Sequence, residues 1–454
     1  MEHLEADLLV IGWGKAGKSL AKTLGAAGRS VVMVEQSSQM YGGTCINVAC
    51  VPTKALVHHA GERRGEDVDK WFTASVGKRD TLIDKLRAAN HTMLDTMDTV
   101  TLVDGRARFV GPHEVEVSAG DDRLRISAAT VVINTGTVPA RPDLAGVDSP
   151  LVHDSTTLQH VAPLPRRLAV VGGGFIGLEF AGMFADFGSK VTILDSADRL
   201  LSREDEDVAE AVAAALADAG VEVVHGVRAT GFTEDGEGIT VAYDGGALAA
   251  DAVLLATGRR PATDGLGLEA AGIEADERGF VVVDEHLRTS VDGVFAVGDV
   301  NGGPQFTYIS YDDHRIVLDQ LVGEGARRTT DRVAVPTTTF LTPPLSRVGL
   351  SETDARAQGL DVHVVAKRVA DIAAMPRPKI VGETHGLIKF VVNAASGLVL
   401  GATLFCVDSQ ELVNLVALAM RAGVPASDLR DGIWTHPSST EAVNEVLAAL
   451  PRTP

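Results

Sequence analysis

Two segments of the chain show the same order of apolar and polar stretches, and this order predicts one βαβ unit in each. Residues 6–35 contain an apolar strand, a glycine turn, an amphipathic helix and a second apolar strand that ends at Glu35. Residues 168–195 repeat this order and end at Asp195. Strand, turn and helix in this order are typical of half of a Rossmann-like domain. We therefore expect an α/β fold with two Rossmann-like dinucleotide-binding domains.

Each unit carries a GxGxxG motif between its first strand and its helix. The glycines are Gly12, Gly14 and Gly17 in the first motif and Gly172, Gly174 and Gly177 in the second. Glycine lets the backbone approach a pyrophosphate, the helix N-terminus supplies N–H donors, and an acid about twenty residues on accepts a hydrogen bond from a ribose hydroxyl. Two such sites predict two cofactors that exchange electrons.

The remaining pattern predicts further elements around these units. Residues 61–100 look helical and polar, and residues 101–133 alternate like an antiparallel meander. Residues 291–300 predict a buried strand that ends at Gly298 and Asp299, followed by a helix from about residue 308. A third region, from residue 333 onward, mixes strands with an amphipathic helix over residues 410–423.

Composition and charge narrow the class of protein. The 454 residues carry a formal net charge of -20, which argues against nucleic acid or an anionic membrane as partner because both require a basic face. The first residues are acidic where an export signal is basic, and no apolar run is long enough for a membrane helix. We therefore expect a cytoplasmic protein with no membrane partner.

Two of the three cysteines, Cys45 and Cys50, lie five positions apart in the segment GGTCINVACVPTK. Structural disulfides are rare in the cytoplasm, so this spacing favours a catalytic or a metal-binding pair.

Several motifs occur together in the chain: the cysteine segment, the two GxGxxG motifs, ATGRRP, VFAVGDV and the terminal HPSSTE. In these motifs the chain resembles the FAD-dependent pyridine nucleotide-disulfide oxidoreductases. These motifs follow the family's order from residue 10 to residue 441. The resemblance implies a discontinuous FAD domain (residues 1–145 and 262–333), an NAD(P)H domain (residues 146–261) and a C-terminal α+β dimerisation domain (residues 334–454). A homodimer is therefore expected.

The resemblance also implies which residues hold the cofactors. Gly12, Gly14, Gly17 and Glu35 would hold the adenosine half of FAD, and Asp299 would contact its ribityl chain. Gly172, Gly174, Gly177 and Asp195 would hold the nicotinamide cofactor, and Phe175 stands where several relatives carry a residue that gates its pocket. The other expected cofactor-binding residues are Gly43, Thr44, Lys54, Thr135, Gly136, Ile176, Gly258, Arg259 and Gly298. An acid at position 195 repels a 2′-phosphate and favours NADH, while Arg199 and Arg203 keep NADPH as an alternative.

The same likeness pairs Cys45 and Cys50 in a redox disulfide, with Cys50 contacting the flavin and Cys45 exchanging with substrate. Five residues of regular helix rise about 7.5 Å, more than disulfide Cα atoms usually allow, so a bridge requires a break in the helix. Lys54 and Glu179 match the family's ion pair near the two cofactors.

The tail supplies the acid-base candidates. The resemblance makes His436 a base near the thiols, contributed by the other subunit, and Glu441 the group that orients it. The spacing of Ser438 and Glu441 also fits a capping box, which needs no catalysis and can coexist through Ser438.

A further set of stretches (GKAGK, MYGGTCIN, GGPQFTYIS, LTPPLSRVG and FCVDSQELVN) resembles a bacterial branch of the family that reduces copper(II) in defence against reactive chlorine. We therefore expect copper(II) as acceptor, with Cys45 and Cys50 as its ligands. The alternatives are reduction of a small disulfide, such as lipoamide or a low-molecular-weight thiol dimer, and a mercuric-reductase-like activity. The chain lacks the terminal cysteine pair typical of mercuric reductases, which argues against efficient mercury reduction.

Three other residues and one other class of function stay open. His58 and His59 follow Lys54 on the expected helix and are either metal ligands or solvated side chains, and Cys406 is either a ligand or a small buried hydrophobe. A redox or metal sensor is the hypothesis from another class, and the complete NAD(P)H site argues against it.

Overall fold

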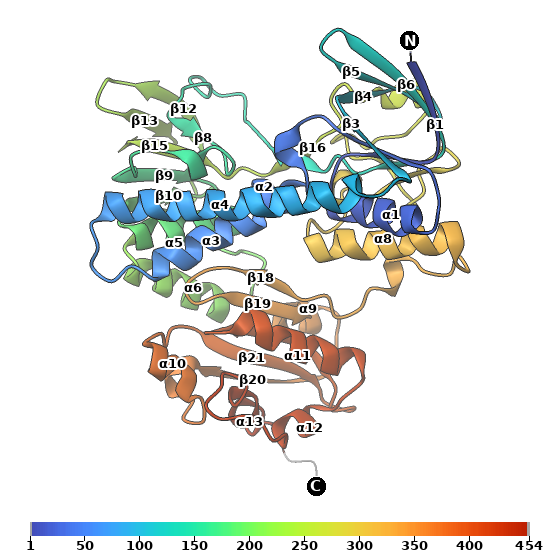
Figure 1. Ribbon diagram of the computed structural model, residues 1–454. Coiled ribbons are helices and arrows are strands. Elements are labelled where there is room, and N and C mark those ends of the chain that lie inside the picture. The colour runs from blue at the N-terminus through green and yellow to red at the C-terminus, as the bar shows by residue number, and fades with distance from the viewer. Residues whose placement is uncertain (1, 452–454) are drawn as a thin grey trace. The chain divides into compact units, whose positions relative to one another are not determined.

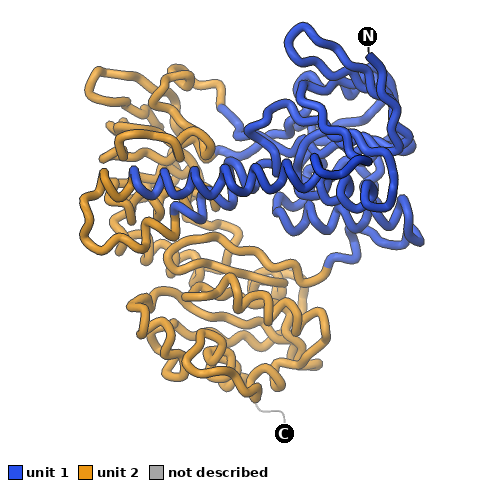
Figure 2. The backbone as a smooth tube through the Cα atoms, viewed as in Figure 1, with its two compact units in different colours: residues 1–56, 73–141, 257–332 blue, residues 57–72, 142–256, 333–454 orange. Residues whose placement is uncertain are grey.

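A computed structural model describes residues 2–451 of the chain. These residues form two compact units, coloured separately in Figure 2. Unit 1 contains the residues up to 56, then 73–141 and 257–332, and unit 2 contains residues 57–72, 142–256 and those from 333 onward.

Unit 1 contains the first βαβ unit and a mixed seven-stranded sheet in the order β3-β2-β1-β6-β5-β4, with β17 also paired to β6. Its strands are β1 (Glu2–Ile11), β2 (Val31–Glu35), β3 (Val100–Asp104), β4 (Arg106–Gly111), β5 (Glu114–Ala119), β6 (Asp122–Ile133) and β17 (Val294–Ala296), with a separate pair, β7 (Thr137–Pro139) and β16 (Arg259–Pro261). Its helices are α1 (Lys15–Ala26), η1 (Ser38–Met40), α2 (Thr44–Asn47), α7 (Leu268–Ala271), η3 (Gly298–Asn301), α8 (Thr307–Val322) and η4 (Thr329–Asp331).

The core of unit 1 follows from the apolar strands. β1 pairs in parallel with β2 and β6, so the buried residues 8–11 lie in the middle of the sheet. Helix α1 packs against β1, β2 and α8 and buries its apolar stripe there (Figure 1).

Two helices contribute to both units along the chain. α3 (Cys50–Gly61) begins among the residues of unit 1 and ends among those of unit 2, and α4 (Val68–Asp95) begins in unit 2 and ends in unit 1.

The first part of unit 2 is the second βαβ unit. Its parallel sheet has the order β11-β10-β9-β15-β8, beside a three-stranded antiparallel sheet β12-β13-β14. The strands are β8 (Val152–His153), β9 (Arg167–Val171), β10 (Lys190–Leu194), β11 (Val221–Val224), β12 (Ala229–Glu234), β13 (Ile239–Tyr243), β14 (Gly246–Ala250) and β15 (Ala252–Leu255), and the helices are η2 (Leu158–His160), α5 (Phe175–Phe187) and α6 (Glu206–Asp218).

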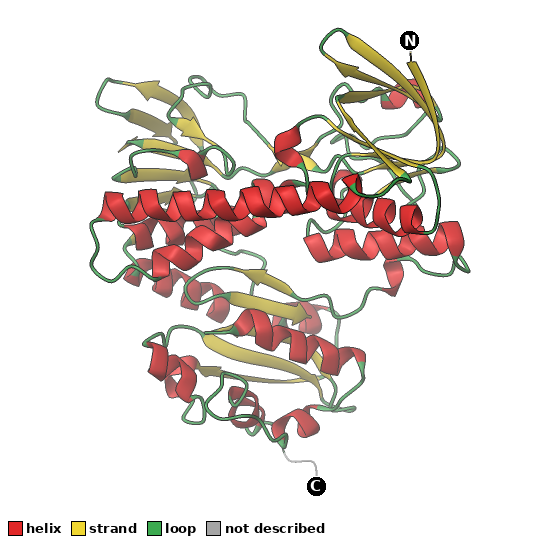
Figure 3. Ribbon diagram, in the orientation of Figure 1, coloured by secondary structure: helices red, strands yellow, loops and turns green. Residues whose placement is uncertain are grey.

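The second part of unit 2 is an antiparallel sheet in the order β18-β19-β22-β21-β20. The strands are β18 (Thr337–Thr339), β19 (Leu345–Gly349), β20 (Val362–Arg368), β21 (Leu387–Asn393) and β22 (Val399–Phe405), and the helices are α9 (Glu352–Ala357), η5 (Val369–Asp371), α10 (Pro376–Val381), α11 (Ser409–Arg421), α12 (Ala426–Arg430) and α13 (Ala442–Leu447). α11 packs on β19 and β22, and α13 packs on β20 and β21 (Figure 3).

The structure confirms the α/β fold with two Rossmann-like halves and a third α+β region. The polar helix expected in residues 61–100 is α4, and the helix expected from about residue 308 is α8. The meander expected over residues 101–133 is wrong at its start, because β3 pairs in parallel with β2 and the antiparallel strands begin only at β4. Among residues 2–451, no helix combines the length and apolarity needed to cross a bilayer.

Candidate functional site

The first glycine turn is shaped by a side chain that the sequence analysis did not select, Asn134. A Cβ atom on Gly12 would lie 2.5 Å from the Asn134 backbone oxygen, and one on Gly14 would lie 2.4 Å from Asn134 Oδ1. The Gly17 N–H donates to Asn134 Oδ1 at 2.9 Å. Asn134 follows β6, so the two parallel strands β1 and β6 bring it against the turn. A Cβ atom on Gly12 or Gly14 would clash with Asn134, so the turn needs glycine there, and a glycine turn before a helix N-terminus is typical of a pyrophosphate site.

Glu35 ends β2 beside this turn. Its carboxylate accepts hydrogen bonds from the backbone N–H groups of Trp13 and Ser37, at 3.1 and 3.3 Å. Burial raises the pKa of Glu35 to about 7, against the lowering effect of those N–H groups. A ribose hydroxyl that donated to this carboxylate would stabilise its charged form.

Thr135 supplies an unsatisfied polar atom at the end of β6, where it follows Asn134. Its Oγ1 is buried and makes no hydrogen bond within the described chain. A buried hydroxyl without a partner is costly, so this atom fits a site completed by a ligand. The residues present therefore fit a dinucleotide such as FAD.

The segment that carries the cysteines packs directly on this turn. Gly43 has φ +80°, and a Cβ atom there would lie 2.9 Å from Gly14 Cα. Thr44 begins the short helix α2, and Cys45 follows it. The helix stops at Asn47 and α3 begins at Cys50, so the expected break between the two cysteines is present.

Both thiols are free in this structure and share a hydrogen bond. The hydrogen bond with Cys50, followed by Thr307 and the charges of Lys18 and Lys54, lowers the pKa of Cys45 to about 6. The same hydrogen bond raises the pKa of Cys50. Because the charges of Lys18 and Lys54 are among the causes that lower the pKa of Cys45, we assign the first thiolate of the pair to Cys45.

Lys18 and Thr307 are parts of this site that the sequence analysis missed. The Lys18 side chain is buried and donates to the Gly42 carbonyl at 3.1 Å and to Asn90 Oδ1 at 2.7 Å. Burial lowers the pKa of Lys18 to about 8. Thr307 is the first residue of α8, and its Oγ1 lies 3.8 Å from Cys50 Sγ. Lys18 is one lysine among several on an amphipathic helix, so only the fold identifies it.

Two further candidates of unit 1, Asp299 and Arg259, both contact Thr137. Asp299, in η3, accepts a hydrogen bond from Thr137 Oγ1 at 3.3 Å, and burial raises its pKa. Arg259, in β16, donates to Thr137 Oγ1 and to the Thr137 carbonyl at 2.8 and 2.7 Å. The candidates Gly136, Gly258 and Gly298 are in left-handed conformations.

The second glycine turn, in unit 2, has a similar geometry. Gly172 has φ +110°, and a Cβ atom on Gly177 would lie 2.0 Å from the Gly172 oxygen. Asp195 follows directly after β10 with its side chain against the turn, since a Cβ atom on Gly173 would lie 2.5 Å from Asp195 Oδ2. Gly174 is exposed and caps the start of α5. These residues fit the pyrophosphate and adenosine ribose of a second dinucleotide.

Phe175, Ile176 and Glu179 belong to the first two turns of α5. Phe175 is 54% exposed, so its ring is accessible. Glu179 is buried, and its Oε1 accepts a hydrogen bond from the Phe340 N–H at 2.8 Å. Arg199 donates to the carbonyls of Ser202 and Glu204, so its guanidinium is bonded to its own loop.

His436 and Glu441 form the pair expected from the tail. His436 Nδ1 lies 2.8 Å from Glu441 Oε1, and the imidazole lowers the pKa of Glu441. The predicted cap through Ser438 is wrong, because the Ser438 hydroxyl donates to the Thr435 carbonyl and α13 begins after Glu441 without a side-chain cap. Glu441 Oε2 instead accepts from the Ser438 N–H at 2.9 Å, so its carboxylate is held on both sides.

The structure contains two glycine turns, each followed by an acid where the second strand ends, and a thiol pair packed on the first turn. A further α+β region follows in the sequence. These features together define a disulfide oxidoreductase with two dinucleotide sites. The comparisons agree with this class. Residues 6–313 match the family described as pyridine nucleotide-disulphide oxidoreductase, and residues 335–447 match its dimerisation domain. The chain belongs to the pyridine nucleotide-disulphide oxidoreductase family.

Two relatives and one solved structure illustrate the similarity. The probable pyridine nucleotide-disulfide oxidoreductase RclA of Escherichia coli (strain K12) is 45% identical over 97% of this chain and 98% of its own. The mercuric reductase of Streptomyces lividans is 35% identical over 98% of this chain and 96% of its own. The Cu(II) complex of the HOCl-induced flavoprotein disulfide reductase RclA from Escherichia coli is 44% identical, with a TM-score of 0.95 over 98% of this chain and 100% of that chain.

The family membership makes the protein an oxidoreductase and implies FAD and NAD(P)H as its cofactors. It also confirms the expected fold class of two dinucleotide-binding domains and a dimerisation region.

Proposed function

We propose that the protein transfers electrons from NADH, through FAD and a Cys45–Cys50 disulfide, to copper(II). The observation that carries this proposal is the position of the thiol pair, whose segment packs on the first glycine turn and has one thiol with a pKa of about 6. The copper complex of a relative that covers nearly the whole chain supports the choice of acceptor.

FAD would be held by the first glycine turn and Glu35, and when bound it would supply the hydride and two-electron chemistry that links the nicotinamide to the disulfide. The chain's own residues prepare the thiols. Lys18, Lys54 and Thr307 stabilise negative charge on Cys45, which makes this thiol the nucleophile and the first metal ligand.

Reduction of copper balances with two ions per dithiol. Each Cu(II) takes one electron and becomes Cu(I), the two thiols become a disulfide, and two protons leave. Soft thiolate ligands stabilise Cu(I), which favours this direction. We place the reaction in defence against oxidative or reactive-chlorine stress, because the 45% identical relative is induced by HOCl.

We also propose that the active form is a homodimer, with His436 acting on the thiols of the second copy. Residues 335–447 match the family's dimerisation domain. Near His436, Ile433 is 99% exposed, which is unusual for a large apolar side chain and fits a surface covered by a partner. His436 would accept a proton from Cys45 and return it when the disulfide re-forms.

The test is anaerobic NADH oxidation by the FAD-loaded enzyme with copper(II), mercury(II), oxidised lipoamide or glutathione disulfide as acceptor. Copper-dependent turnover should fall by about a hundredfold or more in Cys45→Ser and Cys50→Ser, since either change removes the disulfide. Cys406→Ala is the matched control, because Cys406 is fully buried in the C-terminal core and its loss should leave turnover unchanged. Faster turnover with lipoamide or glutathione disulfide would make the protein a reductase of small disulfides and overturn the copper assignment.

A further inference from the structure

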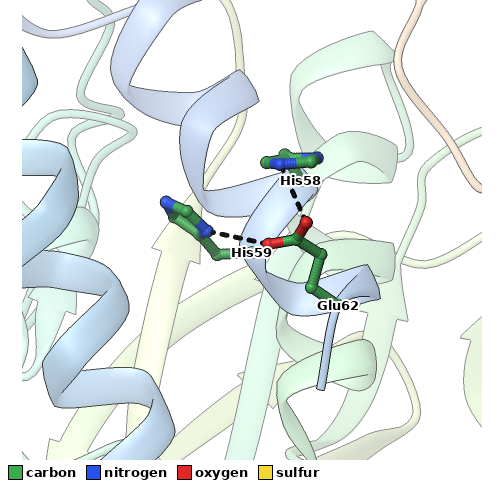
Figure 4. Close-up of side chains that lie close together, drawn as sticks. All are labelled: His58, His59 and Glu62. Atoms are coloured by element: carbon green, nitrogen blue, oxygen red, sulfur yellow. Dashed lines mark hydrogen bonds and ion pairs between the residues drawn. The ribbon is translucent and has the colours of Figure 1, made fainter. Parts of the chain in front are cut away.

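Three side chains at the end of α3 converge outside the thiol site. His58 Nε2 lies 3.2 Å from Glu62 Oε1, and His59 Nδ1 lies 3.4 Å from Glu62 Oε2 (Figure 4). The two imidazole rings are tilted to one another with centroids 5.4 Å apart. One ligand atom from each residue can be chosen so that all three lie within 4.8 Å of one another.

Helical spacing explains this convergence. Residues three and four positions apart are neighbours on a helix surface, so Glu62 reaches both histidines from the following turn. His58 is exposed and the His59 side chain is 17% exposed, so the cluster is open to solvent on one side and supported on the other. The backbone of His59 is held by Trp71, whose Nε1 donates to its carbonyl at 2.8 Å.

The guanidinium groups of the neighbouring Arg63 and Arg64 are hydrogen-bonded to backbone carbonyls. Arg64 donates through Nη1 to the carbonyls of Gly61 and Arg63, and Arg63 donates to the Glu66 carbonyl. Both guanidinium groups are therefore engaged with the backbone of the loop that follows α3.

We propose that His58, His59 and Glu62 form a binding site for a divalent transition-metal ion, with Cu(II) and Zn(II) as the matching chemistry. Two imidazoles and one carboxylate are ligands that suit both ions, and three protein ligands leave a position for water. The bonds from Glu62 to the histidines hold the three side chains near the geometry that the ion requires.

This site is separate in its chemistry from the thiol pair and does not depend on the proposed acceptor. Nitrogen and oxygen ligands favour Cu(II), whereas thiolates favour Cu(I). The cluster would therefore bind an ion in its oxidised state and would not reduce it.

The experiment is a Cu(II) titration of the untagged, FAD-loaded enzyme without NAD(P)H, followed by electron paramagnetic resonance. All proteins carry Cys45→Ser, Cys50→Ser and His3→Gln, so that neither the thiols nor a histidine near the chain start competes for copper. One equivalent of Cu(II) with hyperfine splitting from two nitrogens supports the site. We expect each of the variants His58→Gln, His59→Gln and Glu62→Gln to weaken Cu(II) binding by at least about tenfold. Loss of a residue that only hydrogen-bonds to a metal ligand already lowers metal affinity by about that factor.

His385→Gln is the matched control. His385 also contacts two carboxylates, Glu383 and Asp218, but through opposite ring nitrogens, so its partners do not converge on one point. Its change should leave Cu(II) affinity the same. Copper binding that is absent at 100 μM added ion, which corresponds to a binding free energy of about −5.5 kcal/mol, would overturn the proposal. Binding that survives in all three variants of the cluster would overturn it as well. Circular dichroism of each variant checks that the substitutions leave the fold unchanged.

Discussion

His436 Nδ1 is held 2.8 Å from Glu441 Oε1, which determines the proton arrangement on the imidazole. A carboxylate beside Nδ1 keeps the ring proton there and leaves Nε2 as the atom that can accept a proton. The side chain of His436 is 71% exposed, so its imidazole ring is open to solvent.

We expect His436→Gln to reduce copper-dependent kcat by about a hundredfold, the usual contribution of a general base. Glu441→Gln should have a smaller effect and should also change the pH profile of kcat, because the amide no longer fixes the ring proton. Steady-state rates between pH 6 and pH 9 measure both changes. His385→Gln is the control for loss of an exposed histidine, and equal rates in His436→Gln and His385→Gln would exclude the catalytic role.

The second prediction concerns the charge near Cys45. Lys18→Met removes a buried cation that lowers the pKa of this thiol, so the pKa should rise. At a pH below the pKa, each unit by which the pKa rises reduces the thiolate fraction by about tenfold. We expect the pKa of Cys45 to rise by up to about one unit. The rate of iodoacetamide alkylation of the reduced enzyme against pH gives the midpoint, near 6 in the unmodified protein.

Lys22→Met provides the comparison for this measurement, because Lys22 lies on the same helix but is exposed. Its alkylation midpoint should stay where it is. A midpoint that does not move in Lys18→Met would show that Lys18 holds only the loop around Gly42.

The sequence was sufficient for the elements that carry strong local patterns. Both βαβ units were predicted because glycine spacing and apolar alternation are local properties, and the break between Cys45 and Cys50 was expected from helix geometry. β3 was assigned to the wrong partner, because the strand pattern does not reveal which strand it joins. Lys18 and Asn134 were missed because their roles arise from burial between segments distant in sequence.

The third prediction concerns the choice of nicotinamide cofactor. Asp195 follows directly after β10 and lies against the second glycine turn, where a 2′-phosphate would meet its negative charge. We expect NADH to be used with the higher kcat/KM. Asp195→Ser should lower the ratio of kcat/KM for NADH to kcat/KM for NADPH by about tenfold or more. The reason is that placing the 2′-phosphate of NADPH beside the Asp195 carboxylate costs several kcal/mol.

Asp198→Ser serves as the control for the ratio of kcat/KM with NADH to kcat/KM with NADPH. Asp198 is exposed and lies three residues beyond Asp195, so it changes the net charge without touching the turn. Equal ratios in Asp195→Ser and in the unmodified enzyme would show that another group selects the cofactor.

The last prediction concerns a cluster of carboxylates around the buried Lys389 in unit 2. Lys389 projects from β21, is 4% exposed, and lies 3.1 Å from Asp205, 3.0 Å from Asp207 and 2.8 Å from Glu352. Burial alone would raise the pKa of Asp205, but hydrogen bonds from Thr353 and Lys389 lower it to about 2. Lys389→Met leaves the carboxylates without their shared cation and should reduce the free energy of unfolding by about 3 kcal/mol.

The pH dependence of that loss tests its cause. A carboxylate whose pKa is lowered by folding stabilises the protein above its ordinary pKa of 3.8, and this contribution disappears as the pH falls through about 2. The difference between the unmodified protein and Lys389→Met should therefore shrink between pH 4 and pH 2 in urea unfolding followed by circular dichroism. Lys367→Met, which removes a partly exposed pair with Glu445, should cost no more than about 1 kcal/mol. If Lys389→Met reduced the free energy of unfolding by the same amount at pH 2 as at pH 7, the loss would come from packing of the lysine stem. The ion pairs with the carboxylates would then not be its cause.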